Sequence, residues 1–218
     1  MRFGDVATAV AEGCILAHSL RLGGKTLKKG RVLSGEDVAR IRERGIESVV
    51  AATLEPGDVP EDAAAARLVG AVHGEGLRIS APFTGRCNVF AETDGLLVLD
   101  EAALEQLNFV SEELTVATLP TMSVVVPRQM VATVKVIPFS ASSANLGACE
   151  AIAKDAYPLL RVAPFQPKRI AYIQTRLEGT KESVLDKSTR VLSERLDRLG
   201  SLVELETRCA HETDAVAD

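Results

Sequence analysis

The chain of 218 residues contains no tryptophan, and aromatic residues make up only 4% of it. Single-stranded nucleic acids are commonly bound by stacking their bases on aromatic side chains, so this composition disfavours that class of ligand. A net charge of -5 also disfavours a general binder of polyanions. We therefore expect no nucleic-acid partner.

Long apolar runs are also missing. No stretch reaches the length needed to span a membrane, and the N-terminus MRFGDVATAVAEG lacks the basic flank and apolar core of a signal peptide. These absences predict a cytoplasmic protein with no membrane partner.

Closely spaced metal ligands are missing as well. The cysteines and histidines are far apart, with no CxxC pair: Cys14, Cys87, Cys149, Cys209, His18, His73 and His211. A structural zinc site usually shows its ligands in close pairs. We expect no metal site, and we expect the thiols to be buried or inert.

The familiar catalytic motifs do not occur either. The sequence has no GxGxxG, GxxxxGK[ST] or GxSxG pattern. Adjacent carboxylates such as Glu112 and Glu113 are poor candidates for an acid–base pair, because neighbouring side chains on a strand point to opposite faces. The catalytic residues, if there are any, stay unidentified at this stage.

The sequence does contain a β-rich stretch, Leu77–Phe139, with frequent turn signals. Asp94-Gly95 lies between two apolar runs, Cys87–Ala91 and Leu96–Leu99, and predicts a hairpin with a type I′ turn. Residues 130–137 alternate in polarity with a period of two, which predicts a strand with one buried face. We interpret residues 77–162 as a β-rich core ending in a helix.

Two arms of this stretch, ISAPFTGRCNVF and VVVPRQMVATVKVIPF, resemble the half-repeats of barrel-sandwich domains such as biotinyl and lipoyl carriers. A carrier presents a modified lysine at the tip of a hairpin. Lys135 falls inside the predicted strand instead, so the resemblance favours a structural or positioning role.

Residues 1–76 read as an α+β unit. We expect Met1–Gly13 to form a short helix or ordered arm, followed by a hairpin near Lys25. Ser34 is a good N-cap for a helix over Gly35–Arg44, and a strand follows at Ile46–Leu54. A second helix should run from Pro60 to His73, with His73 as a cap rather than a catalytic base.

The two prolines in the segment 163–167 indicate a linker. After it, an apolar strand at Lys168–Thr175, a helix from about Lys181 to Leu199 and a strand at Ser201–Arg208 predict a βαβ unit with parallel strands. The residues HETDAVAD after them are consistent with the start of another helix. One βαβ unit cannot cover its own sheet, so either another chain completes the sheet or the natural protein continues past Asp218. We favour the second alternative.

Two segments, AEGCILAHSLRLGGKTLKKGRVLSGEDVARIRERGIESVVAATLEPGDVPEDAAAARL and RIAYIQTRLEGTKESVLDKSTRVLSERLDRLG, resemble one family. They are similar to bacterial molybdopterin-binding proteins of molybdenum cofactor biosynthesis. The resemblance is closest to the kind in which this region precedes a nucleotidyltransferase-like domain. It covers essentially the whole chain, and it indicates a family relationship more firmly than it indicates a reaction.

The resemblance implies that residues 168–218 begin a doubly wound α/β domain whose ligand lies at the carboxyl ends of the strands. Thr175, Lys181 and Ser183 would then contact molybdopterin or a nucleotide, helped by a helix N-terminus. Full-length relatives are transferases, with Mg as an expected cofactor. This sequence has Thr175-Arg176-Leu177 where relatives carry a Thr-Gly-type turn, and it lacks their later Gly-rich turn, so most of an active site is missing.

Alternatives remain open at this point. The loop over 175–183 is equally well explained as a solvated loop, with Thr180 as a helix cap. A basic cluster around Lys25, from Arg21 to Arg31, is either a solvated hairpin or a groove for a phosphate. The whole chain could also serve as a non-catalytic interaction module that forms a homo-oligomer.

Overall fold

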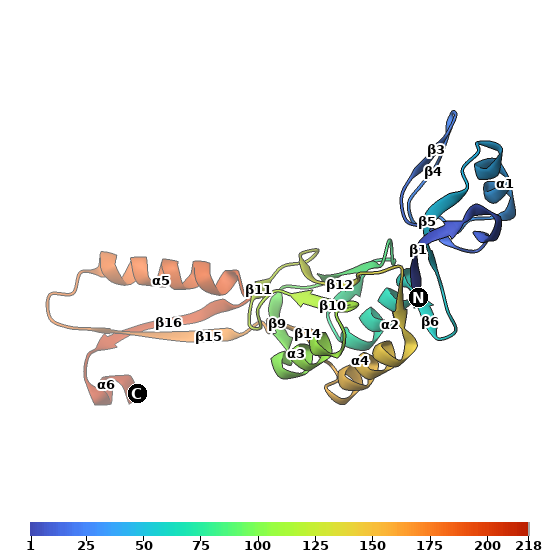
Figure 1. The fold of residues 1–218 in the computed structure, drawn as a ribbon. Helices are drawn as coiled ribbons and strands as arrows, with labels where there is room; N and C mark the ends of the chain where they lie inside the picture. The colour runs from blue at the N-terminus through green and yellow to red at the C-terminus, as the bar shows by residue number, and fades with distance from the viewer. Residues whose placement is uncertain (218) are drawn as a thin grey trace. The chain divides into compact units, whose positions relative to one another are not determined.

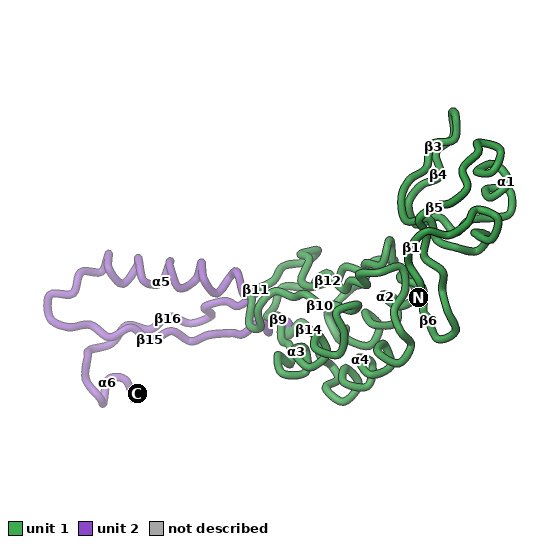
Figure 2. Tube along the Cα trace, viewed as in Figure 1, with its two compact units in different colours: residues 1–163 green, residues 164–218 purple. Residues whose placement is uncertain are grey.

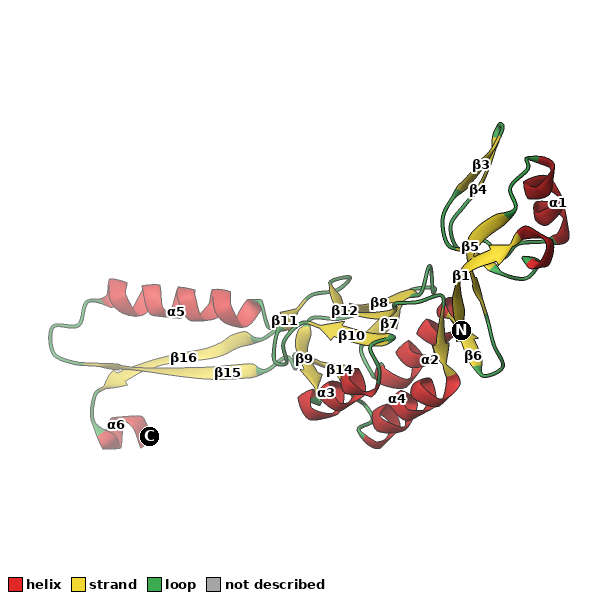
Figure 3. Ribbon diagram, in the orientation of Figure 1, coloured by secondary structure: helices red, strands yellow, loops and turns green. Residues whose placement is uncertain are grey.

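The computed structural model describes residues 1–217, which form two compact units, divided between residues 163 and 164 (Figure 2). The division falls at the first residues of the segment 163–167 that the sequence marks as a linker. Both units mix helices and strands, as the sequence predicts (Figure 3).

The first hydrophobic cluster lies within residues 11–51 and is built around Leu27, Leu33 and Ile41, each at most 1% exposed. Its elements are β1 Arg2–Ala7, the 3-10 helix Thr8–Val10, β2 Ile15–Leu16, β3 Leu20–Leu22, β4 Lys25–Leu27, α1 Gly35–Glu43 and β5 Ser48–Thr53. The strands β1, β5 and β2 form an antiparallel sheet in that order, and β3 pairs with β4 as a separate hairpin.

Of the two alternatives predicted for the N-terminal residues, a short helix or an ordered arm, the structure contradicts the helix. Arg2–Ala7 pairs along its whole length with β5, in the register Arg2 to Thr53 through Ala7 to Ser48. A six-residue segment is too short to be a stable helix by itself, whereas an antiparallel partner satisfies its backbone groups. The interpretation of Met1–Gly13 as a helix is therefore wrong.

The second hydrophobic cluster lies within residues 64–162, where the chain forms two larger sheets (Figure 1). A four-stranded sheet has the order β10 Leu114–Thr118, β12 Met130–Val136, β8 Arg86–Ala91 and β7 Leu77–Ile79. A three-stranded sheet has the order β11 Val124–Val125, β9 Gly95–Leu99 and β14 Leu160–Pro164. A short ladder joins β6 Asp58–Pro60 to β13 Ser140–Ser142.

Three helices pack against these sheets: α2 Glu61–Val72, α3 Glu101–Val110 and α4 Ser143–Asp155. The alanine-rich α2 packs on β12 and β8 and buries Leu68 and Val69. His73 is its C-cap, and its Nδ1 lies 3.1 Å from the carbonyl oxygen of Val69. The expectation that His73 caps the helix is confirmed.

The predicted Asp94-Gly95 hairpin does not form. β8 pairs with β7 and β12, whereas β9 pairs with β11 and β14, so the chain passes from one sheet to the other at residues 92–94. Neither Asp94 nor Gly95 has the positive φ that a type I′ turn requires. Gly95 is needed for space instead, because a Cβ there would lie 2.3 Å from the carbonyl oxygen of Ala163.

None of the sheets in residues 1–217 closes into a barrel, and the comparison with a barrel-sandwich domain is not confirmed. Lys135 lies inside β12, opposite Thr115 of β10 and Arg86 of β8. It is therefore a strand residue, as the sequence indicates, and not the tip of a hairpin.

The second unit consists of β15 Arg169–Arg176, α5 Glu182–Asp197, β16 Leu202–Ala210 and α6 Thr213–Ala217. β15 and β16 pair in parallel, which confirms the predicted βαβ unit. Of the segment HETDAVAD, Asp218 lies outside the described residues. A near-continuous apolar run such as Lys168–Thr175 predicts a strand buried on both faces of a parallel sheet. This prediction is wrong for β15, because Ile173 is 50% exposed, and Leu205 of the neighbouring β16 is 57% exposed.

Candidate anion site at the carboxyl ends of the parallel strands

The candidate site lies where β15 and β16 end. In parallel strands the carboxyl ends meet at the same edge, and here the loop 177–181 and the start of α5 follow β15 directly. Gly179 turns the loop with a φ of 83°. The hydroxyl oxygen of Thr180 accepts a hydrogen bond from the backbone N–H of Leu177 at 3.2 Å.

Lys181 and Ser183 lie at the beginning of α5. Lys181 is the N-cap residue, and no side chain caps the helix. Ser183 is in the first turn, and both side chains are exposed. The first N–H groups of a helix point out of its N-terminus and carry partial positive charge. Lys181 and Ser183 therefore bring an ammonium group and a hydroxyl group to the first turn of α5, where the N–H of Val184 already donates to the carbonyl oxygen of Lys181 at 3.0 Å. Thr180 closes the loop but is not the cap of the helix.

Thr175 is held differently. It is half-buried near the end of β15, and its Oγ1 lies 2.8 Å from Nδ1 of His211, which follows β16. The backbone N–H of His211 donates to the carbonyl oxygen of Arg176 at 3.1 Å. Within residues 1–217, no hydrogen bond joins Thr175 to Lys181 or Ser183. The structure thus places the three predicted residues at one edge of the unit, but directly pairs only Thr175, with a residue that the sequence did not single out.

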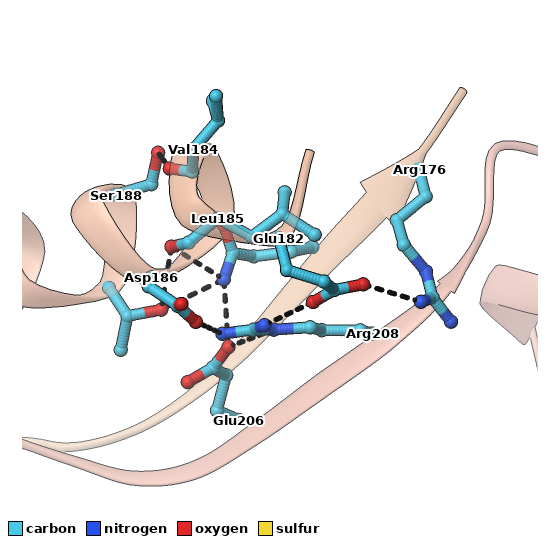
Figure 4. A network of polar contacts seen from close by, with 10 residues as sticks. Arg176, Glu182, Val184, Leu185, Asp186, Ser188, Glu206 and Arg208 are labelled. Carbon is cyan, nitrogen blue, oxygen red and sulfur yellow. Dashed lines mark hydrogen bonds and ion pairs between the residues drawn. The ribbon is translucent and has the colours of Figure 1, made fainter. Parts of the chain in front are cut away.

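A network of charged groups lies between α5 and the sheet (Figure 4). The guanidinium of Arg208 contacts Glu182 at 2.6 Å, Asp186 at 2.8 Å and Glu206 at 2.6 Å. Arg176 binds the other oxygen of Glu182 at 2.9 Å. Two cations therefore surround Glu182, the carboxylate nearest to the helix start.

These contacts shift the titration of the network. Hydrogen bonds from Arg208, then Arg176, lower the pKa of Glu182, and Arg208 lowers the pKa of Glu206. The three carboxylates, Asp186 first, raise the pKa of Arg208. The two arginines pair with the charge of Glu182 and so reduce its repulsion of an anion at the neighbouring helix N-terminus, although Asp186 and Glu206 share Arg208.

Gln174 extends the network into the interior of the unit. It is 5% exposed, and its Nε2 donates to Glu206 at 2.8 Å and to Thr189 at 2.8 Å. The sequence alone favours a solvated helix face for Asp186, which lies opposite the apolar stripe of its helix, and it assigns no role to Arg208. The sequence spacing could have indicated this network. Glu182 and Asp186 are four residues apart on the helix, and Glu206 and Arg208 are two residues apart on the strand, so each pair lies on one face of its element.

Some cations of the basic cluster around Lys25 already have partners within the fold. Arg31 binds Asp37 through two hydrogen bonds, of 2.7 and 3.1 Å, and the Nζ of Lys29 lies 5.7 Å from the ring centre of Phe139. The segment 13–35 contains no carboxylate, so its remaining cations lack local partners. It provides positive charge but no enclosed pocket.

Cys14, Cys87 and Cys149 are buried free thiols, and Cys209 is half-buried. Burial raises the pKa of Cys149 to about 11, which makes this thiol a poor nucleophile. In the described chain, no three His, Cys, Asp or Glu residues are arranged to hold a metal ion. No helix within residues 1–217 is long and apolar enough to cross a membrane.

Comparison with known proteins adds one match. A family model described as a domain of unknown function (DUF8806) matches residues 5–53. The matched segment covers most of the N-terminal sheet, the basic hairpin and α1, under a quarter of the chain. No curated protein and no solved structure matches the chain.

Proposed function

We propose that this chain binds molybdopterin, or a nucleotide form of it, through its phosphate during maturation of the molybdenum cofactor. The proposal joins the sequence resemblance to one structural observation that carries it. The uncapped N-terminus of α5 lies at the carboxyl end of a parallel strand pair, with Lys181 and Ser183 beside it. Phosphate groups are commonly bound at such a position in open α/β sheets.

In this proposal each residue has a defined role. Lys181 supplies a point charge, Ser183 and the first N–H groups of α5 donate hydrogen bonds, and Thr175 orients the ligand together with His211. Residues 168–218 would form the first part of a doubly wound domain, and the β-rich core 77–162 would keep a positioning role. In full-length relatives a bound Mg would help to neutralise phosphate charge. We assign binding, and no reaction step, to the residues of this chain.

The test is an anaerobic binding titration with molybdopterin, in which bound and free ligand are separated and each fraction is then oxidised and measured by the fluorescence of its pterin. Lys181→Glu should weaken binding at least about tenfold, because it replaces the cation at the phosphate with an anion. Lys187→Glu is the matched control, since it makes the same charge change at an exposed position further along α5.

Binding of inorganic pyrophosphate to the same variants separates the phosphate from the pterin. A chain that binds neither molybdopterin nor pyrophosphate, or whose affinity is equal in the two variants, would contradict the proposal.

A second candidate is a non-catalytic interaction module that forms a homo-oligomer. One observation favours it: the sheet face of the second unit that carries Ile173 and Leu205 is exposed, as is Val216 of α6. Exposed apolar patches often mark protein contacts. Sedimentation analysis tests this function, which predicts a stable oligomer that Leu205→Lys dissociates and no affinity for molybdopterin.

A further inference from the structure

A groove on the β-rich core is lined by residues of α3 and of the segment at the end of β10 and after it. Figure 1 shows where α3 and β10 lie in the fold. Its volume is about 680 Å³, within the usual range for ligand pockets. Its apolar lining comes from Leu99, Leu104, Phe109 and Leu119. Phe109 is 80% exposed, although aromatic side chains are scarce in this protein. The groove therefore offers an uncovered apolar surface with an aromatic side chain at its rim.

β10 is an edge strand of the four-stranded sheet, and one side chain covers part of its edge. The amide of Asn108, on α3, donates from Nδ2 to the carbonyl oxygen of Val116 at 3.0 Å and accepts from its N–H at 2.8 Å. Asn108 thereby takes the place of a neighbouring strand at this residue. An edge covered in this way cannot be extended by a long strand of another chain.

The same contacts fix the direction of the next free backbone groups. In an antiparallel pair, alternate residues turn their N–H and C=O groups toward the partner strand and away from it. Leu119 faces β12, because its N–H donates to Val131 at 2.9 Å. Val116 faces away, toward Asn108, so the backbone of Thr118 also faces away from β12. Thr118 lines the groove and presents one donor and one acceptor there.

The groove is also charged on one side. Glu101 and Glu105 line it, and their spacing of four residues places them on the same face of α3. Neither forms an ion pair within the described part of the chain, and no lysine or arginine is among the residues that line the groove. An occupant with positive charge would complement this rim.

We propose that this groove binds a short extended peptide segment of another protein, one with apolar side chains flanked by lysine or arginine. The peptide would add to the edge of β10 at Thr118 through a pair of backbone hydrogen bonds. Its apolar side chains would contact Phe109, Leu104 and Leu119, and its basic ends would reach Glu101 and Glu105. Because Asn108 blocks the edge of β10 at Val116, only a short segment of the peptide can pair with β10. The backbone hydrogen bonds at Thr118 would therefore fix the register of the peptide, and the side chains of the peptide would supply most of its affinity.

The test is fluorescence anisotropy with the labelled peptide Lys-Leu-Val-Leu-Lys and its acidic counterpart Glu-Leu-Val-Leu-Glu, each titrated with the full chain at low and high salt. The basic peptide should bind more tightly, and salt should weaken its binding. The double variant Glu101→Lys with Glu105→Lys should reduce the affinity at least about tenfold. The control for charge is Glu178→Lys with Glu194→Lys, at two exposed positions of the other unit.

Two further pairs of variants test the apolar and backbone contacts. Phe109→Ala should weaken binding, whereas Phe83→Ala, at a residue that is 75% exposed outside the groove, should not. Thr118→Pro removes the backbone N–H that faces away from β12 and leaves the hydrogen bonds between β10 and β12 intact. Thr118→Val is its control, because valine keeps this N–H. Only the proline should weaken binding.

Equal binding of the acidic and basic peptides would overturn the proposal, because it would show that charge does not select the occupant. Loss of binding in Phe83→Ala as well as Phe109→Ala would place the peptide outside the groove and overturn it too. If neither peptide binds, and the chain instead self-associates through contacts that Phe109→Ala removes, the occupant is a second copy and the proposal fails.

Discussion

At the scale of single residues, Asp37 is the most strongly constrained carboxylate of the N-terminal cluster. It is fully buried, accepts two hydrogen bonds from Arg31, and forms a reciprocal capping box with Ser34 at the start of α1. Its bonds to Arg31 exceed the cost of burial and lower its pKa from 3.8 to about 2. Sequence analysis identified Ser34 as the cap, but Arg31 could be recognised as the partner of Asp37 only in the fold.

Replacing Asp37 by asparagine should lower the free energy of unfolding by about 2 kcal/mol at neutral pH, because the folded state loses the charge that Arg31 stabilises. The pKa of Asp37 is depressed in the folded state, so this contribution is present above pH 3.8 and is lost as the pH falls toward about 2. Chemical denaturation of both proteins along this pH range measures the difference. Asp5→Asn, on an exposed strand residue, is the control, and an equal loss in both variants would contradict the assignment.

At the scale of elements, the neighbouring strands β9 and β14 of the β-rich core lie so close together at Gly95 that no side chain fits between them. Gly95 lies on β9, and an added Cβ would meet Ala163 at 2.3 Å and Val162 at 2.9 Å. These atoms belong to the neighbouring strand β14, which pairs with β9 in the same sheet. The strands could accept a larger residue only by moving apart.

Gly95→Ala should therefore destabilise the first unit by about 1–3 kcal/mol, the usual cost of overpacking. Gly147→Ala is the matched control, because it makes the same change in α4 where no atom lies within 4 Å of the new Cβ. That change should stabilise the protein by about 0.5–1 kcal/mol through helix propensity. Thermal unfolding of the two variants should shift in opposite directions, and a shift in the same direction would refute the packing argument.

Most helices, and the parallel βαβ unit, could be predicted from the sequence, because amphipathic periodicity and caps are local signals. Strand partners could not. Asp94-Gly95 has the composition of a hairpin turn, yet β8 and β9 enter different sheets, since their pairing is decided by β12 and β14 far along the chain. At the candidate site, Lys181 and Ser183 could be predicted from a helix start, whereas His211 and Arg208 required the return of β16 beside β15.

At the scale of the whole molecule, the two units are stabilised by different kinds of interaction. The first unit has large apolar clusters with many fully buried side chains. In the second unit Leu185, which is 6% exposed, is the one buried hydrophobic side chain among the described residues, and charged groups surround Arg208. Its stability should thus depend more on charge than on apolar burial.

We expect denaturation of the intact chain to occur in two steps, with the second unit unfolding first. Glu182 and Glu206 have lowered pKa values, so their contribution is present above pH 4.5 and is lost as the pH falls below it. Added salt should also weaken the first step, because these carboxylates are close to solvent. Arg208→Met should lower its midpoint clearly, measured by circular dichroism in urea.

Arg169→Met is the control for that experiment, since Arg169 pairs with Glu204 on the surface and is 75% exposed. Exposed pairs contribute little, so this variant should unfold like the parent. A single transition that responds equally to both changes would show that the network does not stabilise a separate unit.

The parallel pairing of β15 and β16 has a further consequence for synthesis on the ribosome. Arg169 pairs with Leu202, so β15 has no partner strand until about 30 more residues have been translated. During that interval Ile173 and its neighbours are exposed on an unpaired strand, a form that is prone to intermolecular pairing. The speed of translation and the presence of chaperones at this point should therefore decide how much of the newly made protein reaches its native fold.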